Sequence, residues 1–225
     1  MDGEIRHFLR KEARERFLRY VKINTRSDPE SGSHPSTQGQ WTLGKLLREE
    51  LLTLVLAEVE LDGFCYVYGT LPAADGFKGP AVTFCAHMDT SPSEEGCDVV
   101  PALHSEYDGG TIRFPGNEGL VLTPAESPEL KQFLGETIIT SDGRTLLGAD
   151  NKAGIAEIMA ALSALRAFEG LCHPELRIVF TPDEEIGEGA DHITLRRLGN
   201  VGYTVDGGMM GELEQECFDA WELSL

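Results

Sequence analysis

The segment ELRIVFTPDEEIGEGAD at 175–191 carries an apolar run directly into three consecutive acids, Asp183, Glu184 and Glu185. The almost continuous apolar run predicts a β-strand that is covered on both faces. Neighbouring carboxylates repel one another and are costly to bury unless a positive group lies beside them. The simplest interpretation is a solvated acidic loop, because clusters of charge usually mark exposed surfaces. Whether the triplet belongs to a site instead depends on what the rest of the chain places near it.

Two further predicted strands end in the same kinds of side chain. The apolar run AVTFCA at 81–86 is followed by His87 and Asp89, and the segment GYTVDGG at 202–208 places Asp206 after a third strand. The sequence therefore puts imidazole or carboxylate groups just past the ends of three separate strands.

Helical segments alternate with these strands. Apolar residues recur at helical spacing in the segments 5–21, 41–54 and 151–168. The alternation predicts an α/β fold, with helices on both faces of a mostly parallel, twisted sheet. The turn-rich stretch at 91–141 has no clear pattern. A chain of 225 residues is long enough for one large domain.

The strand ends predict where a site lies. In an open α/β sheet, ligands bind outside the carboxyl ends of the strands. We expect six side chains to meet there: His87, Asp89, Asp150 at a helix start, Glu184, Glu185 and Asp206. So many carboxylates require a cation, and carboxylates with imidazole suit zinc, or cobalt or manganese in its place. Two such ions about 3.5–4 Å apart form the usual hydrolytic pair.

Each candidate also has a simpler interpretation. A lone histidine is usually a hydrogen-bonded core or rim residue, but the spacing of His87 and Asp89 on a strand puts both on one face, where Asp89 can orient the imidazole. Asp150 alone is most simply a helix N-cap. The segment GADNKAG at 148–154 could suggest a phosphate loop, but it lacks the G-x-x-x-x-G-K-[ST] pattern. The other histidines are expected to face solvent: His7, His34, His104, His173 and His192.

The composition excludes several classes of partner. A formal net charge of −19, from 38 acidic and 19 basic residues, repels phosphate backbones and anionic membranes. We therefore expect neither nucleic acid nor a membrane as a partner, and no apolar run is long enough for a membrane span. The five cysteines include no C-x-x-C pair, which argues against a disulfide framework or a thiolate zinc site. These features predict a protein of the reducing cytoplasm.

Four motifs, in this order, closely resemble the peptidase T family, the cytoplasmic aminotripeptidases among the di-zinc exopeptidases. They are AHMDTSPS at 86–93, TLLGADNKAGIAEIM at 145–159, FTPDEEIGEGAD at 180–191 and YTVDGG at 203–208. The segment PSTQGQW at 35–41 fits as well, and the similarity extends from about Glu15 to about Ala220. The resemblance implies a zinc exopeptidase-like catalytic domain that hydrolytically removes the N-terminal residue of tripeptides.

The resemblance also implies a role for each candidate residue. One zinc would be held by His87, Asp150 and Asp206. Asp150 would bridge to a second zinc held by Glu185. Glu184 resembles the general base, and Asp89 resembles the residue that orients His87.

Family members continue beyond the length of this chain into a lid or dimerisation domain and then complete the catalytic domain. We therefore expect residues 1–220 to be the N-terminal portion of an incomplete catalytic domain and 221–225 a divergent tail. The last histidine ligand of the second zinc and the dimer-forming lid would be absent. The expected consequences are one tightly bound zinc at most, weak or no hydrolysis, and aggregation or dependence on a partner chain.

Two alternatives stay open at this point. The same metal ligands occur in related di-zinc enzymes, so a dipeptidase or an N-acyl amino acid deacylase is possible. A non-catalytic metal-binding remnant is the alternative outside the enzymes.

Overall fold

The computed structural model describes residues 2–208 and 211–214, and its α-helices match the three predicted segments. They are α1 (Asp2–Tyr20), α2 (Gln38–Thr53) and α3 (Ala149–Ala167). Their apolar positions form one core cluster with the sheet, in which Tyr20, Leu43 and Met159 are fully buried. The helical spacing in the sequence therefore identifies the face that each helix buries.

The main sheet has five strands in the order β1 (Ala57–Leu61), β2 (Val67–Leu71), β8 (Leu176–Thr181), β3 (Val82–His87) and β9 (Val201–Thr204). The pairs β8–β3 and β3–β9 are parallel, whereas β2 pairs antiparallel with both β1 and β8. Only β2 therefore runs against the other four strands. The α/β class is confirmed, and the sheet is mixed because a short turn at 62–66 folds β1 and β2 into a hairpin.

The two faces of the sheet are covered differently. Alternate residues of β8, among them Ile178 and Phe180, share a core with α2 and α3, and α1 packs outside α3. On the opposite face Val179 joins Tyr66 and Tyr68 under the loop that contains η3 (Leu195–Arg197). Within the described ranges, helices thus cover one face, where the sequence pattern predicted both, and a loop covers the other.

The parallel strands bring their carboxyl ends to one edge. His87 at the end of β3 pairs with Thr181 at the end of β8, and Cys85 pairs with Thr204 at the end of β9. The residues that follow these strands therefore start from the same edge, as the sequence predicted. The segment that follows β8 includes the short 3₁₀-helix η2 (Glu184–Ile186), which contains two of the three consecutive acids.

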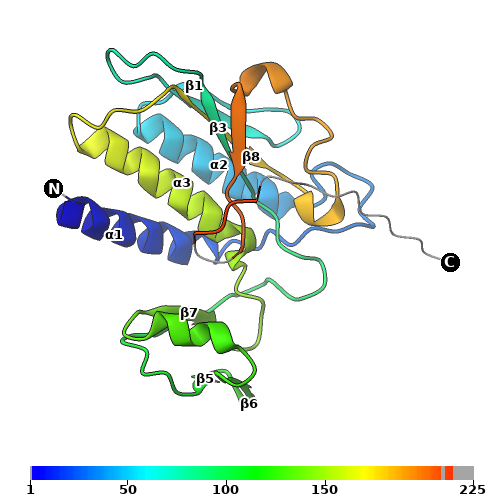
Figure 1. The fold of residues 1–225 in the computed structure, drawn as a ribbon. Helices are drawn as coiled ribbons and strands as arrows, with labels where there is room; N and C mark the ends of the chain where they lie inside the picture. Colours follow the sequence, from blue (N-terminus) through cyan, green and yellow to red (C-terminus); the bar gives the residue numbers. More distant parts are fainter. Residues whose placement is uncertain (1, 209–210, 215–225) are drawn as a thin grey trace.

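The segment without a clear sequence pattern forms a small lobe below the sheet, drawn in green in Figure 1. It consists of β4 (Pro101–His104), β5 (Ile112–Phe114), β6 (Asn117–Leu122), η1 (Pro128–Phe133) and β7 (Ile138–Ser141). β4 pairs with β7 and β5 with β6, both antiparallel. A separate core of Tyr107, Ile112 and Leu130 holds the lobe together. Short strands and many turns explain why no periodicity marks this region.

Two remaining observations concern the limits of the fold. The described part of the chain contains no helix that is both long enough and apolar enough to cross a bilayer. The boundary predicted at residue 220 and the divergent tail at 221–225 lie outside the described residues.

Candidate active site

His87 is the centre of the candidate site. It ends β3, its side chain is 2% exposed, and its Nε2 lies 2.9 Å from Asp150 Oδ1. Its Nδ1 lies 3.1 Å from the backbone oxygen of Asp89 and 3.3 Å from Oδ1 of the same residue. Asp89 therefore contacts the imidazole at Nδ1 and leaves Nε2 facing the other acids.

Two more carboxylates lie near the same nitrogen. Asp206 Oδ2 is 3.7 Å and Glu184 Oε2 is 3.8 Å from His87 Nε2. One ligand atom each from His87, Asp150 and Asp206 can be chosen so that all three lie within 4.8 Å of one another. Side chains that follow different strands and a helix start thus converge, which is the arrangement that the sequence predicted.

Asp89 also holds the acidic turn. Its carboxylate is fully buried and accepts the backbone N–H of Glu184 and of Glu185, each at 3.0 Å. The end of β3 is thereby hydrogen-bonded to the segment that follows β8. The sequence predicted only that Asp89 orients His87. Its hydrogen bonds to the acidic turn were not predicted.

Asp150 is not a helix cap, contrary to the simplest sequence interpretation. Gly148 occupies the N-cap position of α3, no side chain caps the helix, and the backbone of Asp150 is not helical. The Asp150 side chain is instead 65% exposed and points to His87. A left-handed Gly148, with φ of 77°, turns the chain sharply enough to place Asp150 beside the strand ends.

Glu185 lies at the margin of this group. Its N–H binds Asp89, but its carboxylate is not one of the three ligand atoms described above. Burial raises the pKa of Glu185, and the charge of Asp150 raises it further. The two carboxylates are therefore close enough to repel, as two groups that share a cation would be.

The electrostatics of the site fit a cation. Burial is the largest cause that raises the pKa of Glu184 and of Asp206, and in both cases the charge of Asp150 adds to it. Burial alone would lower the pKa of His87, but the hydrogen bond to Asp89 and the surrounding carboxylates raise it to about 9. Crowded carboxylates around one imidazole are the donor set of zinc, so the residues present suit a divalent ion.

Two residues that sequence reasoning did not assign, Ser36 and Gln40, fix the first acid of the triplet. Asp183 is fully buried and its carboxylate accepts the N–H of Ser36 at 2.7 Å, the Ser36 hydroxyl, and the side-chain amide of Gln40 at 2.6 Å. The Asp183 N–H donates to Gln40 Oε1 at 3.1 Å. The motif PSTQGQW at 35–41 was the available signal, because it supplies both partners.

Lys152 was also missed, although it lies in a quoted motif. Its side chain is buried, and Nζ donates to the backbone oxygen of Ile23 at 2.8 Å. Burial lowers the pKa of Lys152 to about 7, and the charge of Asp89 opposes that shift. Lys152 is therefore a buried amine close enough to Asp89 for that charge to favour its protonated form.

Comparison with curated proteins finds extensive similarity. Peptidase T of Geobacillus kaustophilus is 47% identical over 218 residues, which cover 96% of this chain and 53% of that protein. Peptidase T of Desulfitobacterium hafniense is 51% identical over 207 residues, covering 92% of this chain and 50% of that protein. The chain therefore spans about half the length of the curated relatives it matches. No protein-family model matches it.

Comparison with solved structures supports the fold. A tripeptidase from Staphylococcus aureus superposes with a TM-score of 0.61 at 24% sequence identity, covering 88% of this chain and 44% of that structure. At this level of identity the match establishes the shared α/β architecture, and the site rests on the residues described above.

Proposed function

By sequence the chain is a relative of peptidase T, about half of whose length it spans, and on this premise we propose that it belongs to a metal-dependent aminopeptidase acting on tripeptides. One observation carries the proposal. His87, Asp150 and Asp206 offer ligand atoms within 4.8 Å of one another, and Glu184 lies 3.8 Å from the same imidazole. Metal ligands and a free carboxylate are two parts that metal-assisted hydrolysis of a peptide bond uses.

The metal would be zinc, held by His87, Asp150 and Asp206, with Asp150 shared with a second ion at Glu185. A divalent ion bound there would polarise the peptide carbonyl and lower the pKa of the attacking water. The His87 ring is held at Nδ1 by Asp89, so its Nε2 is fixed in direction before any ligand arrives. Zinc as the metal and two as the number of ions are part of the proposal.

Glu184 would be the general base. Its side chain is 54% exposed and so can reach a water and a substrate. Its carboxylate would accept a proton from the attacking water and return it to the departing amine. Burial and the neighbouring carboxylates raise the pKa of Glu184, which makes it a better proton acceptor than an ordinary glutamate. Asp89, by binding the N–H of Glu184, keeps the base at the site.

The substrate and the location are the finer parts of the proposal. Small peptides with a free N-terminal amine, tripeptides in particular, would be the substrates. The cytoplasm would be the location, and the four cysteines within the described residues are all free thiols, which is consistent with a reducing compartment.

The test is release of the N-terminal residue from a tripeptide by the purified 225-residue chain with added zinc. Glu184→Gln should lower kcat/KM by about 10²–10⁴-fold, the usual contribution of a general base. Glu169→Gln, at an exposed position after α3, is the matched control. A chelator should abolish the activity.

The substrate panel separates the alternatives. An N-acetylated tripeptide and a dipeptide are assayed beside the free tripeptide. Preference for the acetylated peptide would favour a deacylase, and preference for the dipeptide would favour a dipeptidase. Slow turnover is expected from this chain, so zinc-dependent release that Glu184→Gln leaves unchanged would contradict the proposal.

A further inference from the structure

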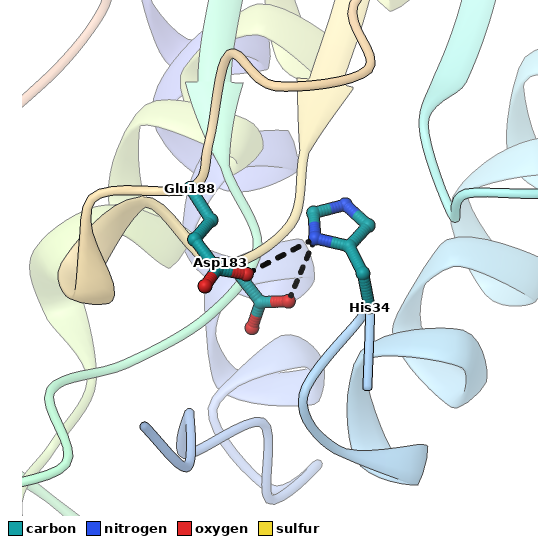
Figure 2. A group of neighbouring side chains, drawn as sticks. All are labelled: His34, Asp183 and Glu188. Carbon is teal, nitrogen blue, oxygen red and sulfur yellow. Dashed lines mark hydrogen bonds and ion pairs between the residues drawn. The ribbon is translucent and has the colours of Figure 1, made fainter. Parts of the chain in front are cut away.

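A second group of ligand-type side chains lies on the other side of the acidic turn. His34, from the loop before α2, points toward the carboxylates of Asp183 and Glu188 (Figure 2). Its Nδ1 is 3.5 Å from Asp183 Oδ2 and 3.4 Å from Glu188 Oε2. The prediction that His34 faces solvent is wrong, because its side chain is only 12% exposed.

The two separations are long for hydrogen bonds. A charge-assisted bond between nitrogen and a carboxylate oxygen usually spans about 2.7–2.9 Å. Two ligands of one tetrahedral zinc, each about 2.0–2.2 Å from the ion, lie roughly 3.4 Å apart. Ligand atoms of all three residues fall within 4.8 Å of one another. The spacing therefore suits three neighbours around one ion.

The imidazole of His34 is fixed in place but not satisfied. Its ring stacks on Tyr66, with centroids 6.0 Å apart, and meets the edge of His192 at 4.8 Å. Its Nε2 is buried and has no hydrogen-bond partner within the described part of the chain. Aromatic contacts thus hold Nδ1 toward the carboxylates while neither nitrogen makes a short hydrogen bond. The nitrogen that faces the two carboxylates, Nδ1, lies 3.4–3.5 Å from each, which leaves room for an ion among them.

The charge of this cluster is also unbalanced. Asp183 is fully buried and its hydrogen bonds come from the neutral donors of Ser36 and Gln40. Among the residues that the structure describes, no lysine or arginine pairs with Asp183 or Glu188. The Glu188 side chain is 46% exposed, so an ion could reach the cluster from solvent and keep water ligands there.

We propose that His34, Asp183 and Glu188 bind a divalent transition ion of the zinc type. Imidazole nitrogen and carboxylate oxygen are ligands that zinc accepts. A carboxylate oxygen has two lone pairs, so Asp183 Oδ2 can bind an ion and still accept the Ser36 N–H. The bound ion ties the loop at 34–36 to the turn that carries Glu184. This site is separate from the His87 cluster, and its existence does not depend on the proposed peptidase activity.

The test measures zinc binding where the first cluster cannot contribute. In the chain with His87→Asn and Asp206→Asn, zinc is titrated against a chromophoric chelator, and bound zinc is counted after dialysis. We expect about one zinc per chain, with affinity falling roughly tenfold or more when His34→Ala or Glu188→Gln is added. The matched control is His7→Ala, which removes an exposed imidazole on α1 and no ligand and should leave the affinity within about twofold.

Two results would overturn the site: no zinc bound in the His87→Asn, Asp206→Asn background, or unchanged affinity after His34→Ala and Glu188→Gln. If a variant fails to fold, the unaltered chain gives the answer through the ring ¹⁵N resonances of His34. Zinc must shift the Nδ1 resonance, and a resonance that responds to pH but not to zinc would mean that His34 only forms an ion pair. Absence of peptide hydrolysis would leave this result unaffected, so the two proposals fail separately.

Discussion

Asp183 and Glu184 are neighbours in the chain, yet they lie in opposite surroundings. Asp183 is fully buried, and neutral donors of Ser36 and Gln40 bind its carboxylate. Glu184 is 54% exposed, and burial together with Asp89, Asp206 and Asp150 raises its pKa. The first acid is stabilised by hydrogen bonds, whereas the second is crowded by like charge.

The difference shows that one acidic turn can serve the fold and the chemistry at once. A carboxylate bound by several donors is stable without a cation, so Asp183 can anchor the turn in the metal-free chain. Carboxylates that face one another repel, and a bound cation relieves that repulsion. An ion at His34 would add to an anchor that already exists, whereas an ion at His87 would relieve repulsion.

The largest predicted effect is a loss of stability when the buried Asp183 is replaced. Asp183→Ala would leave the donors of Ser36 and Gln40 without a buried acceptor, which should lower the free energy of unfolding by about 3–5 kcal/mol. Urea unfolding of the metal-free chain measures it. Asp191→Ala, an exposed position in the same segment, is the control and should change stability by at most about 0.5 kcal/mol. A loss below about 1 kcal/mol for Asp183→Ala would mean that Asp183 is no anchor.

The next effect is a pH dependence of stability that arises from His87 and the carboxylates around it. The pKa of His87 is raised to about 9, so its charged form stabilises the metal-free fold. This contribution is complete below the ordinary histidine pKa of about 6.5 and is lost as the pH rises through about 9. It amounts to about 3 kcal/mol. The advantage of the wild-type chain over His87→Gln should therefore shrink across this range. An advantage that stays constant with pH would contradict the arrangement around His87.

Metal addition gives a somewhat smaller effect. Zinc at a hundred times its dissociation constant should raise the free energy of unfolding by about 2.7 kcal/mol for each occupied site. His87→Asn should remove the gain that belongs to the first cluster, and His34→Ala the gain that belongs to the second. Thermal unfolding with zinc and with a chelator measures both. A zinc effect that neither variant reduces would place the binding elsewhere.

The sequence predicted the residues of the candidate site better than the contacts that hold those residues in place. The strand ends place His87, Glu184 and Asp206 at one edge because parallel strands share a direction, and this follows from local patterns alone. The resemblance to peptidase T added the separate roles of the carboxylates, which spacing cannot distinguish. Those roles remain predictions.

What the sequence could not give depends on contacts between distant segments. Ser36 and Gln40 meet Asp183 only after α2 packs beside β2, and no local pattern records that meeting. Asp150 was expected at the site, although an acid at a helix start is by default an N-cap. The backbone at Gly148 turns it toward His87 instead. The reversed strand β2 follows from a hairpin turn that alternation of helices and strands does not reveal.

The central claim is that a cation stabilises the crowded carboxylates around His87. Its most direct test is the free energy of unfolding of Asp206→Asn, measured with a chelator and with saturating zinc. Asp206 lies 3.7 Å from His87 and its pKa is raised by burial and by Asp150. Without metal, removing this charge should stabilise the chain by up to about 1 kcal/mol. With zinc, the variant should be less stable than the wild-type chain, because a ligand is lost. A variant that is less stable by the same amount in both conditions would contradict the account.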